Sequence, residues 1–200
     1  MRFLNFLLMH TNRFYCLIIV LLAFVSSCRA IVNYTLSPDT QRDVAKITKK
    51  TVKQLTKEGW QVIPGSDKTF EQQVEQIVVF KHFLSERFIC GEGNGVDRDM
   101  EQARQQASTE AFMQLAELLN AHVESETQQL IKTRKMSDEE AHSLTSSVLS
   151  AIVESEESFE ASSQEFTIRR TDKQGKTEIR TYIFYDINAF NSRLACGLVG

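Results

Sequence analysis

The 200-residue chain contains few prolines, glycines, histidines and cysteines, and each shortage excludes a class of protein. Two prolines and eight glycines argue against a linker-rich or repeat-built chain, and the sequence shows no internal repeat. The four histidines form no HExxH motif and the four cysteines form no CxxC pair, so the usual zinc and redox signatures are missing. No acidic residue precedes Cys28, so the beginning of the chain carries only positive charge.

The segment that ends at Cys28 has the composition of an export signal. Its apolar run over residues 14–25 matches the central region of a signal peptide and is shorter than the roughly 20 residues that span a bilayer as a helix. The sequence Val25-Ser26-Ser27-Cys28 resembles a bacterial lipobox, in which the cysteine thiol receives a diacylglycerol and becomes the new N-terminus. This pattern predicts lipid attachment at Cys28.

Two alternatives to the lipoprotein signal stay open at this point. A secretory peptidase could cut after Ala30, where Cys28 and Ala30 would occupy the small-residue positions. Residues 1–25 could also remain as an uncleaved anchor, although Asn5, His10, Asn12 and Arg13 interrupt them. Acyl chains on Cys28 would make attachment effectively permanent, because each buried CH₂ contributes about 0.8 kcal/mol.

Charge and length set the expectations for the rest of the chain. Removing residues 1–28 takes away two arginines and no acid, which moves the formal charge from −3 to −5. A mildly acidic domain is a poor candidate for binding nucleic acid or anionic headgroups. The remaining 172 residues suffice for one core. We therefore expect a lipoprotein signal peptide over 1–28, a tether over 29–36 and a single domain over 37–200.

The domain is predicted to begin with a basic helix. Ser37 and Pro38 indicate its start and Gly59 its end, so we expect a helix over residues 38–58. Its outer face gathers five lysines: Lys46, Lys49, Lys50, Lys53 and Lys57. They indicate either headgroup contact near an anchor or a solvated face, and we favour the solvated face.

The middle of the chain predicts a short helix, a hairpin and a central helix. Thr69 and Gln72 suit a capping box for a helix through Phe70 and Val74. Residues 77–83 fit both a helix continuation and a buried strand; their β-branched side chains favour the strand, with 87–92 as its hairpin partner. The glycines of 91–95 would then form a tight turn into the next helix. A phosphate loop is the alternative there, but the lysine and Ser/Thr of a P-loop are absent.

A stripe of small side chains predicts the central helix over residues 98–120, close against a sheet. The stripe consists of Met100, Ala103, Ala107, Ala111, Leu115 and Leu118. Residues 122–131 fit either a strand or an extension of this helix, and we favour a strand near 121–126. A capping box at Ser137 predicts one more helix.

The C-terminal third predicts a β-hairpin. Phe166 and Ile168 alternate with polar residues, 172–175 form the turn, and 177–187 return. The return strand is apolar on both faces, which is typical of a strand covered on both sides. We therefore expect an α+β fold, in which an antiparallel sheet with a C-terminal hairpin packs against the alanine-rich helix and further helices.

Few residues suggest chemistry. His122, Glu124 and Glu126 would share one strand face, which is either a weak metal site or an exposed polar face, and we favour the latter. A run of glutamates indicates solvated charge: Glu154, Glu156, Glu157, Glu160 and Glu165. No GxSxG motif is present. We therefore expect no catalytic, cofactor-binding or metal-binding residues, and no enzyme.

The cysteines and aromatic residues allow two further interpretations each. Cys90 and Cys196 remain after processing; they could form a disulfide in the cell envelope or stay as two buried thiols that pack as small apolar groups, and we favour the buried thiols. The aromatic residues of the predicted strands would mostly form the core, and an exposed sheet face could bind a partner strand or peptide.

Several segments together resemble a known family, the twenty-kilodalton bacterial lipoproteins (Lpp-twenty-like envelope lipoproteins). The matching segments are Lys57-Glu58-Gly59-Trp60, Pro64-Gly65-Ser66, Phe88-Ile89-Cys90-Gly91-Glu92-Gly93, the alanine helix, the helix from Ser137 and the strand Tyr182–Asp186. The resemblance implies an α+β domain tethered to an envelope membrane, most often the outer membrane of a Gram-negative bacterium, and transfers no catalytic residue. It also favours a structural role for Cys90.

These observations lead to one functional expectation and one alternative. We expect a non-enzymatic envelope lipoprotein, held at the membrane by palmitate-type acyl chains on Cys28, with a structural or protein-binding role and envelope proteins as candidate partners. The alternative is a secreted or periplasmic domain that binds a small ligand or peptide.

Overall fold

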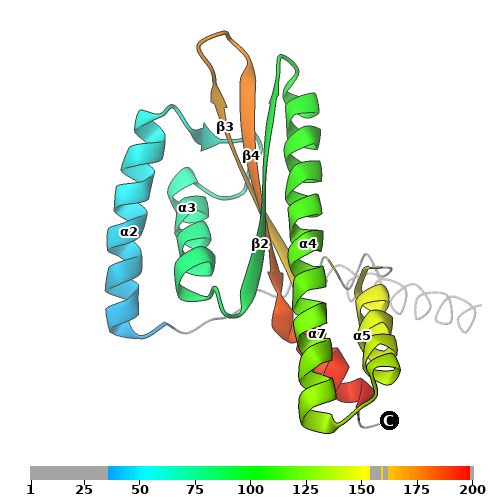
Figure 1. The fold of residues 1–200 in the computed structure, drawn as a ribbon. Coiled ribbons are helices and arrows are strands. Elements are labelled where there is room, and N and C mark those ends of the chain that lie inside the picture. The colour runs from blue at the N-terminus through cyan, green and yellow to red at the C-terminus, as the bar shows by residue number, and fades with distance from the viewer. Residues whose placement is uncertain (1–35, 154–158, 160–161, 199–200) are drawn as a thin grey trace, which may run out of the picture. The chain divides into compact units, whose positions relative to one another are not determined.

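The computed structural model describes residues 36–153, 159 and 162–198, all within the compact unit Leu36–Gly200. Its elements are α2 (Pro38–Lys57), β1 (Gln61–Val62), α3 (Phe70–Val78), the π-helical turn η1 (Val79–Phe83), β2 (Phe88–Asp97), α4 (Met100–Arg134), α5 (Asp138–Val153), β3 (Ser163–Thr171), β4 (Thr177–Asp186) and α7 (Ile187–Gly197) (Figure 1). None of the described helices combines the length and apolar character needed to cross a bilayer.

The strands form one antiparallel sheet in the order β1-β3-β4-β2. Helix α4 covers one face, while α3 covers the other and α2 lies outside α3 (Figure 1). The internal strand β4 is apolar on both sides: Ile183 and Tyr185 pack toward α4, and Phe184 packs against Phe80 on the α3 side. The predicted α+β class, the C-terminal hairpin and the doubly covered return strand are confirmed.

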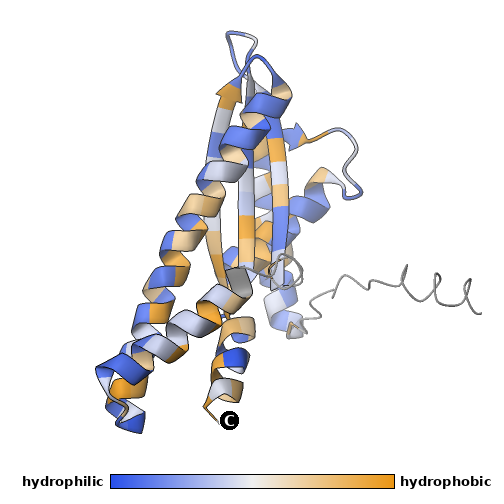
Figure 2. Ribbon diagram, turned by 90° about the vertical axis from the view of Figure 1, so that its right-hand side faces the viewer, coloured by the Kyte–Doolittle hydropathy of each residue, from blue (hydrophilic) through white to orange (hydrophobic). Residues whose placement is uncertain are grey.

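The backbones of helix α4 and strand β2 are in direct contact. A Cβ atom added to any of three glycines would collide with a carbonyl oxygen of α4: Gly91 with Ala111, Gly93 with Ala107, and Gly95 with Ala103. The spacing matches because four helical residues rise about 6.0 Å and two strand residues about 6.7 Å. We call this contact the glycine–alanine seam. Viewed from the α4 side, the helix lies along the sheet and mixes hydrophilic with apolar residues (Figure 2).

The seam corrects the prediction of a glycine turn over 91–95. These glycines lie inside β2, which pairs with β4 from Phe88 opposite Asp186 to Asp97 opposite Thr177. The strand needs glycine at these positions because side chains there would hold it away from the helix. The chain makes no turn at this point. The space in front of them is filled by α4, so the phosphate-loop alternative fails as well.

Side chains of α4 also cover the outer edge of β2. Three backbone N–H groups of the strand donate to them: Glu92 to Gln114 Oε1, Asn94 to Glu110 Oε2 at 2.6 Å, and Val96 to Gln106 Oε1 at 3.3 Å. The acceptors recur every four residues and the donors every two, in the same register as the seam. An edge strand whose N–H groups are occupied in this way is a poor template for another strand.

The predicted strand over 77–83 is wrong. Helix α3 continues to Val78, and Val79–Phe83 form a π-helical turn. Five apolar side chains of this segment are buried: Val74, Ile77, Val78, Val79 and Phe80. This segment buries its apolar side against the sheet as a helix, and β2 takes β4 as its partner instead.

The predicted end of the central helix near 120 and the strand near 121–126 are also wrong. Helix α4 runs to Arg134, and its second half packs on α5 and α7. Within the stripe, Met100 and Leu118 are 38% and 40% exposed, whereas Leu119 is buried. The buried side continues through Thr127 and Leu130, because α5 provides a second packing partner beyond the sheet.

The predicted starts and turns are confirmed by hydrogen bonds. Ser37 caps α2, and Thr69 caps α3 in a capping box with Gln72. Ser137 Oγ accepts from the Glu140 N–H at 3.3 Å, and the Ser137 N–H donates to Glu140 at 3.1 Å. In the hairpin, the Gly175 N–H donates to the Asp172 carbonyl at 3.1 Å.

Candidate functional site

The predicted site residues are dispersed over the domain. Cys28 lies outside the described residues, as do Glu154, Glu156, Glu157 and Glu160 of the predicted acidic cluster. Glu165 is exposed on β3. The prediction of lipid attachment therefore keeps its basis in the sequence of residues 1–28.

Cys90 and Cys196 are both free thiols. Cys90 is half-buried on β2, where burial, reinforced by the negative charge of Glu92, raises the pKa of its thiol to about 12. Cys196 lies on α7 and is exposed, so the expectation of two buried thiols is wrong for this residue. A thiol that stays protonated at neutral pH is a poor nucleophile, which fits a structural role for Cys90.

His122, Glu124 and Glu126 lie on helix α4 rather than on a strand face. Successive residues of a helix are rotated by about 100°, so alternate residues point to different sides. The His122 Nε2 atom lies 3.1 Å from Asn191 Oδ1, and the imidazole packs edge-on against Phe190. Within the part of the chain that the structure describes, no three His, Cys, Asp or Glu residues are grouped to hold a metal.

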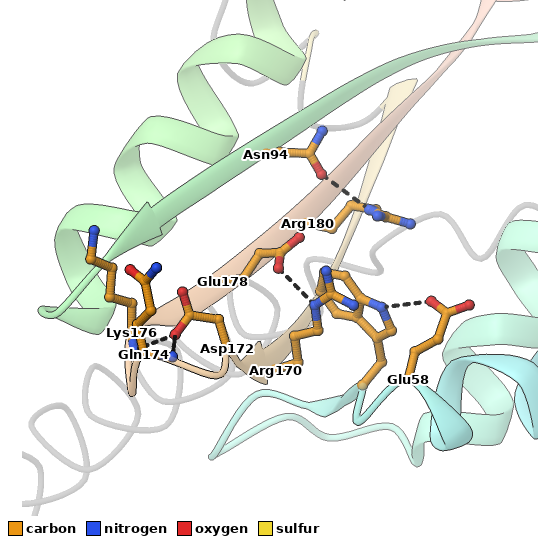
Figure 3. A network of polar contacts seen from close by, with 9 residues as sticks. Glu58, Asn94, Arg170, Asp172, Gln174, Lys176, Glu178 and Arg180 are labelled. Carbon is orange, nitrogen blue, oxygen red and sulfur yellow. Dashed lines mark hydrogen bonds and ion pairs between the residues drawn. The ribbon is translucent and has the colours of Figure 1, made fainter.

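A cluster around Trp60 joins the end of α2 to the C-terminal hairpin. The guanidinium groups of Arg170 and Arg180 both lie over the ring of the buried Trp60, at 4.7 Å and 4.6 Å from its centroid. Figure 3 shows the two arginines with their polar partners. Polar partners orient these groups: the Trp60 Nε1–H donates to Glu58 at 3.3 Å, Arg170 to Glu178 at 2.7 Å, and Arg180 to Asn94 at 3.1 Å. We call this set the Trp60 cluster.

The Trp60 cluster is built to hold elements together. The hydrogen bond from Arg170 to Glu178 raises the pKa of the guanidinium, which is charged in any case. Two cation–π contacts and three hydrogen bonds connect the α2–β1 turn, which holds Glu58 and Trp60, to β2, β3 and β4. The sequence prediction missed this cluster, because the residues come from four separated segments. The lone tryptophan followed by Pro64-Gly65 was the available signal.

An open polar groove of about 870 Å³ runs beside α4 and the edge of β2. Amide and carboxylate side chains form most of its lining: Gln102, Gln105, Gln106, Gln114, Glu92, Glu110 and Glu117. Gln106, Glu110 and Gln114 each use a side-chain oxygen to accept a hydrogen bond from the backbone of β2. Such a groove can hydrogen-bond a polar ligand.

The predicted basic face of α2 is present and exposed. We call Lys46, Lys49, Lys50, Lys53 and Lys57 the lysine stripe; all five side chains are exposed. On the opposite side of α2, Val44 and Thr48 are buried against α3. The amphipathic pattern therefore agrees with the sequence prediction.

Comparison with known proteins adds no relative. No family model, no curated protein and no solved structure matches this chain. The resemblance to the twenty-kilodalton lipoproteins stays a prediction.

Proposed function

We propose that the chain is a non-enzymatic envelope lipoprotein, attached to a membrane through acylated Cys28, whose α+β domain has a structural or protein-binding role. The observation that carries the proposal is the order of features before residue 29: positive charge, twelve apolar residues, then Val25-Ser26-Ser27-Cys28. The folded unit begins at Leu36, only eight residues after that cysteine. Such an arrangement suits a domain held close to a membrane by a short tether.

Metabolic labelling with radioactive palmitate in a bacterial host tests the attachment. We expect label on the wild-type chain and none on Cys28→Ala. Cys16→Ala is the matched control, because Cys16 lies within the apolar run and leaves with the signal. It should label as strongly as wild type.

The same experiment separates the three processing routes. Mass spectrometry of the purified protein should find a lipid-modified Cys28 as the first residue. An unmodified N-terminus at Ile31 would indicate secretory cleavage after Ala30, and an intact Met1 would indicate an uncleaved anchor. Either result would overturn the lipoprotein proposal.

The polar groove beside α4 favours a second candidate function, the binding of a small polar ligand or peptide. Its lining offers hydrogen-bond donors and acceptors in a recess of about 870 Å³. Titration of the protein with trialanine and with a chitin oligomer, followed by NMR of the glutamine side-chain amides, tests it. We expect shifts at Gln102 and Gln105 that disappear in Thr109→Trp, which fills the groove. Equal shifts in both proteins, or none, would contradict this function.

A further inference from the structure

The charge of this chain is strongly divided between α2 and the rest of the domain. Helix α2 carries six cations and two carboxylates. From Glu58 onward the chain carries fourteen cations and twenty-four carboxylates. The net charge of the mature domain is therefore negative, although helix α2 by itself is basic.

The lysine stripe is continuous. At about 100° per residue, its five lysines fall within an arc of about 100°, and at 1.5 Å per residue they span about 17 Å. The buried residues Val44 and Thr48 lie on the opposite side, against α3. The ammonium groups therefore point away from the domain as one surface.

The stripe is not neutralised by the domain. Among the described residues, none of its five ammonium groups lies within 4.0 Å of a carboxylate; the ion pair of α2 joins Arg42 to Asp39 at its exposed N-terminal end. Other basic residues are paired, such as Lys81 with Glu92 at 2.6 Å and Arg170 with Glu178 at 2.7 Å. Water and counterions solvate these exposed ammonium groups, and a negatively charged surface outside the domain would release those counterions on contact.

We propose that the lysine stripe binds the anionic phospholipid headgroups of the membrane to which Cys28 attaches the chain. This inference rests on the proposed function for its geometry. Ten residues from Cys28 to Pro38 reach at most about 36 Å, so the start of α2 stays near the bilayer. Juxtamembrane lysines are attracted by anionic lipids within a Debye length, each strengthening binding by about fivefold.

The acidic remainder of the domain also favours one orientation of the domain on the membrane. The same anionic surface repels the carboxylates that follow Glu58, so α2 turns toward the membrane and the body turns away. Helix α4 lies on the other side of the sheet from α2 (Figure 1). The groove beside α4 would then face away from the lipid. The stripe thus fixes which surface of the domain is offered to other envelope components.

Vesicle binding of the full chain with Cys28→Ala tests the inference. The apolar segment 14–25 is common to all variants, so its contribution cancels when anionic vesicles (phosphatidylcholine with phosphatidylglycerol) are compared with pure phosphatidylcholine vesicles. The test variant carries Lys49→Gln, Lys50→Gln and Lys53→Gln. The control carries Lys132→Gln, Lys135→Gln and Lys173→Gln, exposed lysines outside α2 that lower the charge equally.

We expect the parent chain to prefer anionic vesicles by more than tenfold in about 50 mM salt, and to lose most of that preference in about 500 mM salt. The test variant should lose at least tenfold of the preference, and the control less than threefold. Equal circular dichroism of the three proteins confirms that they fold alike, since all substituted side chains are exposed.

Three results would overturn the inference: no preference of the parent chain, an equal loss in the control, or tighter binding to duplex DNA than to anionic vesicles. Palmitate labelling of the same lysine variants with Cys28 restored separates this inference from the proposed function. Absence of label on every variant would refute the lipid anchor alone, while the vesicle comparison reports on the stripe.

Discussion

The two faces of the sheet pack against their helices in different ways. On the α4 face, glycines of β2 meet alanines of α4 and the two backbones nearly touch. On the α3 face, four large rings fill the space, and Phe80 lies 4.6 Å from Phe88 and 5.1 Å from Phe184 between ring centroids. The glycine–alanine seam leaves no room for an added side-chain atom, whereas the α3 face depends on the volume of its rings. The difference teaches that one sheet can meet one helix through residues without side chains, as β2 meets α4, and another helix through large side chains.

Gly93→Val should have the largest effect, because it inserts a branched side chain into the seam. Its Cβ would collide with the Ala107 carbonyl oxygen, and backbone cannot move aside as a flexible side chain does. We expect a loss on the order of 5 kcal/mol or failure to fold, measured by urea denaturation.

Gly175→Ala is the matched control for that substitution. Gly175 has a φ of +76° in the hairpin turn, and a Cβ there would meet nothing within 4 Å. It should cost about 1–2 kcal/mol through the left-handed conformation alone. A Gly93→Val protein as stable as this control would show that the seam is not tight.

Phe80→Ala probes the aromatic face. Phe80 is 1% exposed and contacts the rings of Phe88, Phe166 and Phe184. We expect a loss of about 3–5 kcal/mol from the cavity, measured by the same denaturation. Partial rescue by Phe80→Leu, which restores most of the volume, would confirm that this face depends on volume, and equal losses in both variants would contradict it.

Alkaline pH should lower the free energy of unfolding, first through a group on the α3 face and then through one on the α4 face. Burial raises the pKa of Cys90 from 9.0 to about 12 on the α3 face and that of Tyr185 from 10.0 to about 12 on the α4 face. Because the unfolded chain releases these protons first, both contributions are intact below pH 9; stability then falls from pH 9 through Cys90 and from pH 10 through Tyr185.

Denaturation of wild type and Cys90→Ala between pH 8 and 11.5 measures the thiol contribution. The variant should lose less stability than wild type between pH 9 and 10, where Tyr185 does not yet contribute. Parallel curves over that interval would show that Cys90 is not perturbed by burial. Lysines titrate in both proteins, so the difference between the curves isolates the thiol.

Glu110→Ala should have the smallest effect on stability. It removes the acceptor for the Asn94 N–H at an exposed site, which should cost about 0.5–1 kcal/mol.

Replacing Gln106, Glu110 and Gln114 together should open the edge of β2 to pairing between copies, detected as light scattering at high concentration. A triple variant that stays monomeric would mean that α4 does not protect this edge.

Local signals along the chain predicted a large part of the fold. Ser37 with Pro38, Thr69 with Gln72, and Ser137 with Glu140 each act within four residues, and all three caps form as predicted. The Trp60 cluster and the polar groove could not be predicted from local signals, because they combine segments that are distant in sequence. The lysine stripe could be predicted, because its five residues share one helix.

The sequence by itself determined the helix starts, the hairpin turn at Asp172–Gly175 and the two apolar faces of β4, because these depend on neighbours within a few residues or on strict alternation. Tertiary structure decided the rest. The β-branched segment 77–83 suits a helix or a strand, and only packing against the sheet selected the helix. The same holds for the glycines of 91–95: their meaning depends on α4 lying against them, and a backbone contact between distant segments leaves no local signature.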